Sequence, residues 1–572
     1  MKSRDESARI REARAPTILP LANHGDESNF VLPHPTSCPL MASFRRWFLA
    51  ALAASVVTAE QVQKSGLQLP ASAAAHQEAV KDLFVTSYEA YQTYAWGHDD
   101  LLPISKKYFD GRNGWGASIA DAMGTMWIMG LTDWFEKAVE HTANTNFTVS
   151  QTSDTVSLFE TTIRYVGGFL SAYELSGEKY PVLVEKAQDL ADQMAYAWVA
   201  ANQSIPYGYI DFTDHQPTLD TSNIAEAGTL TLEWNRLSKH TGNSTYRELA
   251  EKSVQFMIQM PAPLPGMPAQ GINPKTGDSI GGYVTWGGGS DSYFEYLIKY
   301  ARLTNTDDNS YADAWLTAVD TSMKTLLRTS TVDDWLYLAD YDDNKNIRHV
   351  GSHLACFYGG NWILGGKLTN NDTLVNLGLQ LTDACWNTYA STATGIGPEV
   401  FAYKSSDGNY TGNSAPNQDQ LDFYDKHGFY ITSADYYLRP EVLESNFYAW
   451  RVTGDTKYLD NAASATSNFK KYLSTTVAYT GIWDVNNVDS TKIDDMESFW
   501  FAEVLKYLYL TFDDPDHISL DDWVFNTECH PFKAPPAKAC YGSGNLVPSK
   551  PFSPESPISV PLPAISPIPA LL

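Results

Sequence analysis

Thr241-Gly-Asn-Ser-Thr-Tyr246 and Thr453-Gly-Asp-Thr-Lys-Tyr458 are two copies of a short motif that recurs along the chain. In each copy Gly or Asn stops one helix, and Asp, Asn or Ser caps the next. The motif returns about every 65 residues, and a single helical hairpin cannot bury its apolar face alone, so the repeats must pack side by side. Further copies begin at Ser176, Thr304 and Thr369.

Helical periodicity dominates the sequence between these motifs. Apolar residues three or four apart form one stripe of an amphipathic helix, as at Val156, Phe159, Ile163, Val166, Leu170 and Tyr173. About fourteen such segments are expected. Their spans are 74–95, 117–129, 131–142, 154–176, 182–200, 222–240, 244–259, 291–303, 310–328, 352–364, 372–388, 432–453, 455–474 and 494–512.

Helices in this number pair into about seven hairpins, which predicts an all-α fold, an (α/α)7 barrel of helical hairpins. An open solenoid is the alternative. A solenoid usually carries a more regular repeat and fewer long irregular loops than this chain has.

The two ends of the chain differ from the segment between them. Residues 41–59 have the layout of a signal peptide, with Arg45 and Arg46 before a short apolar run that ends in small residues. A type II membrane anchor is the alternative, although the run is short for a membrane span. We therefore expect residues 1–40 to be a non-native or disordered extension, residues 74–532 to form one catalytic domain, and the Pro-rich tail 541–572 to be disordered.

Composition narrows the classes of function. The chain has 40 Lys+Arg against 67 Asp+Glu, a formal net charge of -27, which disfavours binding to nucleic acid. The five Cys form no CxxC pair, which argues against a zinc site. Sequons agree with passage through the secretory pathway and lie at Asn146, Asn202, Asn243, Asn371 and Asn409.

Carboxylates in apolar or Gly-rich surroundings are the candidates for chemistry. Glu160 and Arg164 are four residues apart and share a helix face, next to a Gly167-Gly168 pair that calls for a close approach of backbone or ligand. Asp291 follows a Gly-rich loop and opens a helix. A structural ion pair and a plain N-cap are the respective alternatives.

Two more segments carry acidic residues at positions that need a reason. Glu441 and Glu444 lie in the first turn of a helix after Pro440, where the helix dipole favours the ionised form that a base needs. The alternative is that they only compensate the helix dipole. Glu503 lies on an apolar helix face. Thr527 lies among acidic residues, and such oxygen ligands suit a hard cation such as Ca²⁺.

Taken together, these segments resemble glycoside hydrolase family 47, the class I α-mannosidases. The resemblance runs from about Ala79 to Pro531. The segments Phe159-Glu-Thr-Thr-Ile-Arg and Ser498-Phe-Trp-Phe-Ala-Glu look most like those of the secreted fungal α-1,2-mannosidases. The motifs that carry it are Tyr94-Ala-Trp-Gly-His-Asp-Asp-Leu-Leu-Pro, Phe159-Glu-Thr-Thr-Ile-Arg, Leu175-Ser-Gly, Gly289-Ser-Asp-Ser-Tyr-Phe-Glu-Tyr-Leu-Ile-Lys, His353-Leu-Ala-Cys-Phe, Gly397-Pro-Glu399, Leu438-Arg-Pro-Glu-Val-Leu-Glu-Ser, Glu503-Val-Leu-Lys-Tyr-Leu-Tyr-Leu and Val524-Phe-Asn-Thr-Glu-Cys-His-Pro.

The resemblance implies Ca²⁺ dependence and hydrolysis with inversion. Thr527 matches a residue that binds Ca²⁺ through its hydroxyl and carbonyl oxygens, with waters completing the shell. Glu160 matches the acid, Glu441 the base and Asp291 a third catalytic carboxylate; whether Glu160 or Asp291 delivers the proton stays open. Positions that match sugar-contacting or metal-shell residues are Arg164, Glu226, His353, Arg439, Glu444, Phe499, Glu503 and Glu528.

The resemblance also implies a disulfide between Cys356 and Cys385. Two departures stand out. Gly124 replaces the second Asp of a family motif, and Cys529 stands where Ala is usual, near enough to Cys540 in sequence to pair with it.

The sequence therefore predicts a secreted, Ca²⁺-dependent, inverting exo-α-1,2-mannosidase that trims high-mannose N-glycans, works as a monomer and has no membrane span in its mature form. One alternative is a mannose-binding quality-control lectin with little hydrolytic activity. Another is a helical-toroid glycosidase that acts on glucans. The three retained carboxylates argue against the lectin.

Overall fold

The computed structural model describes residues 62–200, 202–413 and 415–555. All of the described residues belong to one compact unit. The predicted extension 1–40 and signal peptide 41–59 lie outside the described residues.

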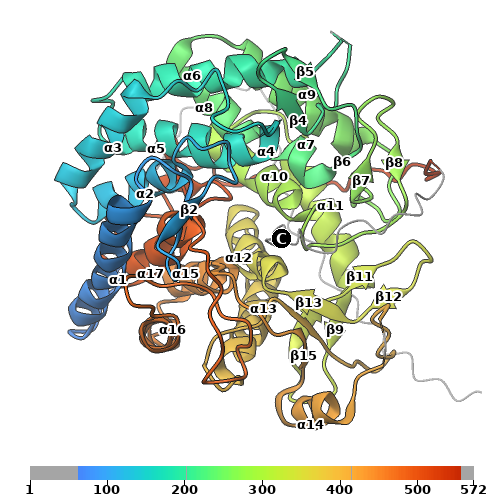
Figure 1. Ribbon diagram of the computed structural model, residues 1–572. Helices are drawn as coiled ribbons and strands as arrows, with labels where there is room; N and C mark the ends of the chain where they lie inside the picture. The colour runs from blue at the N-terminus through green and yellow to red at the C-terminus, as the bar shows by residue number, and fades with distance from the viewer. Residues whose placement is uncertain (1–61, 201, 414, 556–572) are drawn as a thin grey trace, which may run out of the picture. The chain divides into compact units, whose positions relative to one another are not determined.

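Two sets of helices build the described part of the chain (Figure 1). The inner set is α2 (Ala117–Ile128), α5 (Gly167–Leu175), α8 (Thr231–Thr241), α10 (Asp291–Thr304), α12 (Tyr358–Leu368), α15 (Glu441–Thr453) and α17 (Leu505–Phe512). The outer set is α1 (Ala73–Tyr94), α3 (Thr132–Asn144), α6 (Val182–Met194), α9 (Thr245–Gln259), α11 (Ser310–Thr325), α13 (Asp372–Ala390) and α16 (Lys457–Tyr472).

Contacts between neighbouring helices close the inner set into a ring. Each inner helix packs on the next in chain order, and the π-helix η4 (Trp500–Val504) that leads into α17 packs on α2. Each inner helix also packs on an outer one, with α1 as the partner of α17, so the first and last described helices form the seventh hairpin. The predicted (α/α)7 barrel is confirmed, and the open solenoid is wrong because the two ends of the array meet.

Glycines let the helices approach closely. A Cβ atom on Gly168 of α5 would lie 2.7 Å from the carbonyl oxygen of Ala120 in α2, and one on Gly167 would lie 2.7 Å from Asn526 Nδ2. Two glycines within a helix lower its stability, and the close contact with the backbone of α2 explains why they are present here.

Several predicted spans are interrupted where the chain approaches the barrel interior. The span 154–176 contains α4 (Leu158–Glu160) and the π-helix η1 (Thr161–Val166) before α5 begins. The span 222–240 breaks between α7 (Ile224–Gly228) and α8. The span 432–453 is wrong in its first part, because helix α15 begins only at Glu441. No helix was predicted at α14 (Gln418–His427), in which only Tyr424 is buried.

Shorter helical turns continue two other predicted spans. They are the 3₁₀ turns η2 (Ala195–Ala197) after α6 and η3 (Leu354–Phe357) before α12.

Small antiparallel sheets lie mainly in the connections that enter the inner helices. They pair β1 (Asp100–Leu102) with β2 (Lys107–Phe109), β9 (Leu327–Thr329) with β10 (Leu336–Leu338), β11 (Asp340–Tyr341) with β12 (Ile347–Arg348), and β16 (Trp523–Phe525) with β17 (Pro531–Lys533). The three-stranded sheets are β3 (Val156–Ser157), β4 (Tyr209–Asp211) and β5 (Gln216–Pro217); β6 (Ser222–Asn223), β7 (Gly271–Ile272) and β8 (Ser279–Ile280); and β13 (Val350–Ser352), β14 (Val400–Ala402) and β15 (Tyr430–Ser433).

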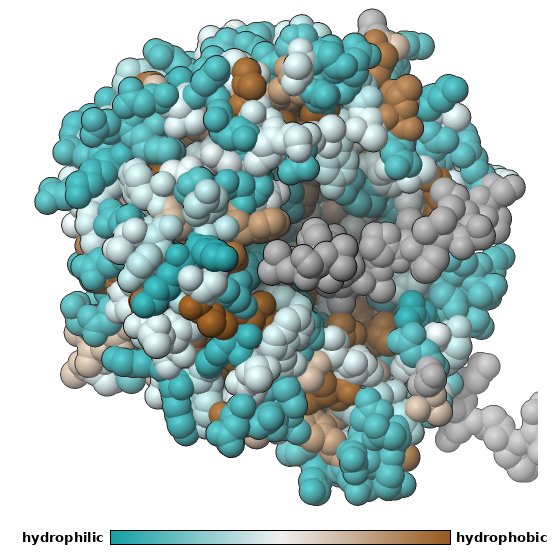
Figure 2. All heavy atoms as spheres, viewed as in Figure 1, coloured by the Kyte–Doolittle hydropathy of each residue, from teal (hydrophilic) through white to brown (hydrophobic). Residues whose placement is uncertain are grey.

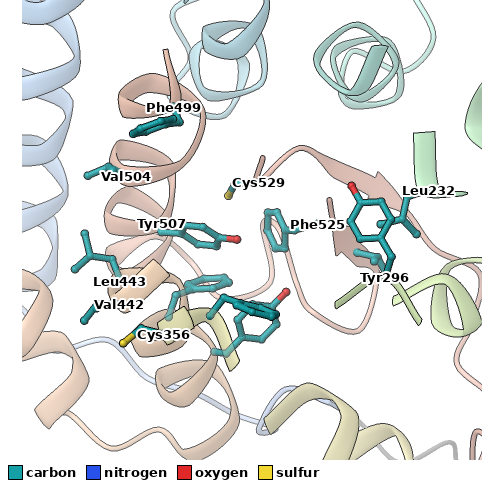
Figure 3. Close-up of a cluster of buried hydrophobic side chains, with 14 of the residues drawn as sticks. Leu232, Tyr296, Cys356, Val442, Leu443, Phe499, Val504, Tyr507, Phe525 and Cys529 are labelled. Atoms are coloured by element: carbon teal, nitrogen blue, oxygen red, sulfur yellow. The ribbon is translucent and has the colours of Figure 1, made fainter. Parts of the chain in front are cut away.

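The β16–β17 hairpin enters the interior of the barrel. Strand β16 packs on α10 and β17 on α5, and Phe525 is fully buried. Figure 3 shows Phe525 between Tyr507 of α17 and Tyr296 of α10, with Cys529 of the same hairpin beside Tyr507. Aromatic side chains from the C-terminal part of the chain thus fill the interior of the barrel.

The described part of the Pro-rich tail is ordered, so the prediction of a disordered tail is wrong for residues 541–555. The backbone amides of Ser543 and Val547 donate to Asp313 Oδ1 and Thr317 Oγ1 of α11, at 2.7 and 2.9 Å. Glu555 forms a parallel β-bridge with Ile280 of β8. Proline is incompatible with a helix interior, but it is compatible with an extended segment whose other amides donate hydrogen bonds to neighbouring helices. Residues 556–572 lie outside the described residues.

The surface is largely polar. Hydrophilic side chains cover most of the face shown in Figure 2, in keeping with the net charge of -27. Within residues 62–555 as described, no helix is both long and apolar enough to span a membrane. Four of the predicted sequon asparagines, Asn146, Asn202, Asn243 and Asn409, are exposed.

Candidate active site

The N-terminal ends of the inner helices bring the predicted site residues together. Each inner helix returns through an antiparallel outer helix, so all inner helices start at the same end of the ring. Residues at or just before these starts are Glu160 in α4, Glu226 in α7, Asp291 in α10, His353 before η3, Glu441 in α15 and Phe499 before η4. The positive ends of the helix dipoles therefore converge on this region.

Glu441 is held as an ionised carboxylate. His353 Nδ1 lies 2.7 Å from Glu441 Oε2, and His353 Nε2 lies 2.8 Å from the Tyr389 hydroxyl. Burial alone would raise the pKa of Glu441, but His353 and Arg439 lower it below its ordinary value. A buried carboxylate that stays ionised is suited to accept a proton.

Arg439 is oriented in turn by a second carboxylate. Its Nε donates to Glu399 Oε2 at 2.5 Å, and the backbone amide of Tyr437 donates to Glu399 Oε1 at 3.2 Å. Leu438, just before Arg439, has a φ of 65°, a conformation that is costly for leucine. Such strain persists only where the surroundings impose it, and it is commonest next to functional residues.

Glu160 lies between two guanidinium groups. Arg164 Nε donates to Glu160 Oε2 at 2.7 Å, and Arg112 Nε lies 3.6 Å from the same oxygen. Burial raises the pKa of Glu160, and Arg164 and Arg112 outweigh it, so the pKa is lowered. The predicted i,i+4 pair forms across the start of a π-helix, a feature that is frequent at functional sites. The carboxylate is 36% exposed and is open to a ligand.

Asp291 has the opposite electrostatics. It is the first residue of α10 and not its N-cap, which is Ser290, and its Oδ1 accepts a hydrogen bond from the backbone amide of Ser292 at 2.8 Å. Burial, with smaller contributions from Glu295 and Glu441, raises the pKa of Asp291 to about 7. Asp291 is therefore able to carry a proton at mildly acidic pH, in contrast to Glu160 and Glu441.

The loop between β16 and β17 places Thr527 among carboxylates. Asn526 anchors the loop, because its Nδ2 donates to Glu233 Oε1 at 2.8 Å and its Oδ1 accepts from the amide of His530 at 2.7 Å. The amide of Thr527 donates to the Tyr296 hydroxyl at 3.2 Å. Thr527 is half-buried, between residues that are fully buried.

Three buried glutamates gather near this loop. Burial and the neighbouring carboxylates raise the pKa values of Glu503 and Glu528 well above the ordinary value, and burial raises that of Glu444 to about 8. Glu528 pairs with Arg164. Glu444 lies 3.8 Å from Lys299 Nζ. No hydrogen-bond donor reaches Glu503 in the described part of the chain, so burial favours its neutral form unless a cation is bound nearby.

Phe499 and Glu226 complete the predicted set. The guanidinium of Arg164 lies 5.6 Å from the centre of the Phe499 ring. Glu226 Oε2 accepts from Ser222 Oγ at 3.0 Å, and burial raises the pKa of its carboxyl group. The Phe499 ring is 8% exposed, which leaves part of it for contact with a ligand.

Similarity to known proteins decides the family. The family model described as glycosyl hydrolase family 47 matches residues 83–534. The chain belongs to glycosyl hydrolase family 47. The (α/α)7 barrel and the cluster of carboxylates at the starts of its inner helices are thus those of a glycosyl hydrolase.

Several fungal proteins are similar to this family 47 hydrolase. A probable mannosyl-oligosaccharide alpha-1,2-mannosidase 1B of Aspergillus clavatus is 39% identical over 510 residues, which cover 84% of this chain and 97% of the relative. The mannosyl-oligosaccharide alpha-1,2-mannosidase 1B of Emericella nidulans is 38% identical over 506 residues, or 85% and 97%. The solved structure of alpha-1,2-mannosidase from Trichoderma reesei matches with a TM-score of 0.78 and 36% identity, covering 81% of this chain and 99% of that one.

Sequence reasoning missed several residues that shape the site of this family 47 hydrolase. Arg112 donates to Glu497 Oε2 at 2.9 Å and reaches Glu160, yet it lies in a loop with no periodic pattern. Asp121 holds Arg164 at 3.4 Å and His530 at 3.3 Å. Glu399 was part of a quoted motif, but no role in the site was assigned to it. The one signal available in the sequence was an acidic residue within an otherwise apolar helix, as at Asp121, because a buried carboxylate needs a partner.

One of the two cysteine pairings considered from the sequence is present in the structure. Cys356 and Cys385 form a disulfide, as the resemblance implied. Cys529 is a free, buried thiol and does not pair with Cys540. The space at Gly124 is bordered by Lys506, whose Nζ donates to the carbonyl oxygen of Cys529 at 2.6 Å.

Proposed function

We propose that this chain is a Ca²⁺-dependent, inverting exo-α-1,2-mannosidase that removes terminal α-1,2-linked mannose from high-mannose N-glycans. The observation that carries the proposal is the division of the carboxylates, with Glu441 ionised beside His353 and Asp291 able to hold a proton. Inversion requires one carboxylate and one carboxylic acid that act from opposite sides of the sugar. The relatives are mannosyl-oligosaccharide alpha-1,2-mannosidases by name, which supports the linkage and the substrate.

The residues have the following roles in this proposal. Glu441 accepts the proton of the attacking water, and His353 and Arg439 keep it ionised until then. Asp291 gives its proton to the departing oxygen, because its pKa of about 7 leaves it protonated in mildly acidic solution. Glu160 is the alternative donor, but its two arginine neighbours favour its ionised form. It instead orients the substrate together with Arg164.

The terminal mannose binds between Phe499 and the β16–β17 loop. The face of Phe499 contacts the apolar side of the sugar ring, and the polar residues around it bind the hydroxyls. Arg164, Glu226, Glu444, Glu503 and Glu528 supply these polar groups.

A Ca²⁺ ion fits the residues around Thr527. The donors there are oxygens, which Ca²⁺ prefers, and the buried Glu503 carboxylate has no cation near enough to pair with it among the described residues. Nowhere in the described residues do three His, Cys, Asp or Glu side chains come together as direct ligands. Thr527 would hold the ion through its hydroxyl and carbonyl oxygens, and the buried glutamates near the loop would supply negative charge. When bound, the ion supplies positive charge that helps orient and acidify water.

The proposal also covers location and assembly. We propose secretion as a monomer; the exposed sequon asparagines support passage through the secretory pathway. A lectin without turnover is the second candidate, but it would not need an ionised and a protonated carboxyl group side by side.

Release of mannose from α-1,2-mannobiose, followed by NMR with and without EDTA, tests the proposal. We expect β-mannose as the first product, loss of activity with EDTA and recovery with Ca²⁺. A folded protein that binds the disaccharide without hydrolysing it would support the lectin. Release of α-mannose would contradict inversion.

A further inference from the structure

The ordered tail, residues 541–555, runs along the barrel wall from one end of the ring to the other. It starts at Tyr541, whose hydroxyl donates to Asn305 Oδ1 at 2.6 Å, just after the C-terminal end of α10. It ends at Glu555, which lies beside β8 in the connection that leads into the N-terminal end of α10 (Figure 1). The candidate active site lies at the N-terminal ends of the inner helices, so the tail reaches the end of the ring that carries the site.

We propose that residues 543–555 are a strap that fixes the β7–β8 hairpin and thereby positions Asp291, with Glu555 as the positioning residue. The proposal rests on the proposed function, in which Asp291 is the acid. It gives the Pro-rich tail a part in catalysis, through the loop that leads into α10.

Two outer helices anchor the first part of the strap. Asp313 of α11 accepts hydrogen bonds from the backbone amide and the hydroxyl of Ser543, at 2.7 and 2.6 Å. One turn further along α11, Thr317 Oγ1 accepts from the backbone amide of Val547 at 2.9 Å. Lys550 Nζ donates to the last backbone carbonyl of α9. The strap therefore connects two neighbouring hairpins.

The prolines of the strap suit a docked, extended segment. Pro548, Pro551 and Pro554 are all exposed, and the backbone amides that donate hydrogen bonds belong to other residues. Proline restricts φ in the unfolded chain as well as in the folded one, so ordering such a segment costs less conformational entropy. The composition that prevents a helix thus helps the strap to stay in place.

Glu555 joins the strap to the β7–β8 hairpin. Its backbone amide donates to the carbonyl oxygen of Ser279 at 3.0 Å, within the parallel bridge to Ile280. Its carboxylate accepts from Asn273 Nδ2 at 3.1 Å and from Thr276 Oγ1 at 3.0 Å. Asn273 and Thr276 lie in the turn between β7 and β8, so one residue holds both the turn and the second strand.

The hairpin acts on Asp291 through Gln270, the residue just before β7. The backbone amide of Gln270 donates to the carbonyl oxygen of Tyr283 at 2.8 Å, which extends the pairing beyond β8. The side chain of Gln270 donates through Nε2 to the carbonyl oxygen of Gly288 at 2.6 Å. The loop Gly287–Gly289 has no side chains with which to hold itself in place, so Gln270 supports the backbone that leads into Asp291.

This line of contacts leads to the proposed acid and not to the elements proposed to bind the mannose. Phe499 precedes η4, and Thr527 lies in the β16–β17 loop, whereas the strap contacts described above are to α9, α11 and the β7–β8 hairpin. Loss of the strap should therefore lower kcat and leave KM nearly unchanged. A general loosening of the fold would change KM as well.

The test compares two shortened chains with the full-length enzyme, all with Ca²⁺. One chain ends at Gly542 and the other at Glu555, so the difference between them isolates the strap. For α-1,2-mannobiose, we expect kcat of the chain ending at Gly542 to be about tenfold below that of the chain ending at Glu555, with KM within about twofold. Hydrogen exchange of the amides in residues 271–289, followed by mass spectrometry, should be about tenfold faster in the shorter chain.

Glu555→Ala is the second variant and remains informative if the shorter chain does not fold. It removes the two carboxylate hydrogen bonds and leaves the backbone bridge, so kcat should fall by about threefold and exchange in residues 271–289 should rise. Glu78→Ala, which changes an exposed glutamate of α1, is the matched control and should leave both quantities unchanged.

Equal kcat values and equal exchange in the two shortened chains would overturn the inference. A loss of kcat with a parallel rise in KM would also overturn it, because it would indicate general loosening. A full-length enzyme that releases no mannose would overturn the proposed function instead, and exchange in residues 271–289 would still test the strap.

Discussion

Replacing Asp291 by Asn tests the proposed division of labour among the carboxylates. An amide oxygen can still accept the hydrogen bond from the backbone amide of Ser292, so local structure should survive. The side chain loses only its exchangeable acidic proton. General acid catalysis contributes about 10²–10⁴-fold, so kcat should fall by this factor.

The pH dependence follows from the electrostatics. Because burial raises the pKa of Asp291 to about 7, its carboxyl group is protonated below that pH and ionised above it. The wild-type kcat should therefore hold below about pH 7 and fall about tenfold per pH unit above it. The pKa of Glu441 is lowered, so the base is lost only in more acidic solution. If Glu160 were the proton donor, its lowered pKa would put the alkaline limb in the acid range.

The assay is mannose release from α-1,2-mannobiose between about pH 4 and pH 9. Asp291→Asn should remove the alkaline limb from the residual activity, whereas the matched variant Glu160→Gln should reduce activity and leave that limb in place. The reasoning is refuted if the limb persists in Asp291→Asn, or if it disappears in Glu160→Gln.

Four further outcomes are expected. Glu441→Gln should lower kcat by several orders of magnitude with unchanged circular dichroism, and near-normal turnover would exclude it as the base. Removal of divalent cations with EDTA should abolish activity and lower the melting temperature, and Ca²⁺ alone should restore both; full activity in EDTA would contradict the metal site. Gly124→Ala should stabilise the fold by about 0.5–1 kcal/mol in denaturant unfolding, because its Cβ meets no atom closer than 3.6 Å. The matched Gly168→Ala, whose Cβ would lie 2.7 Å from a backbone oxygen, should destabilise it, and equal effects would contradict the packing argument. Replacing both Cys356 and Cys385 by Ser opens a loop of 29 residues and should cost about 3–4 kcal/mol, and an unchanged unfolding midpoint would show that the disulfide adds nothing.

Much of the fold could be predicted because its signals are local. Apolar residues recur every three or four positions through the outer helices, and Gly, Asn and Asp end or cap them within a few residues. The repeat of the capping motif determined the hairpins and their number. The carboxylates at helix starts, such as Asp291 and Glu441, were visible because helix starts are themselves local features.

Other features depend on residues far apart in the chain, and only the tertiary structure decided them. The ring closes because α1 packs on α17, and Arg112 joins the site through a loop that carries no pattern of its own. The tail 541–555 is ordered by hydrogen bonds that its backbone amides donate to α11, although its prolines predicted disorder. Burial raises the pKa values of both Asp291 and Glu160, and the two differ because only Glu160 has arginine neighbours that outweigh its burial. Sequence spacing determines which residues share a helix, whereas burial and the electric field at a side chain arise only when distant segments meet.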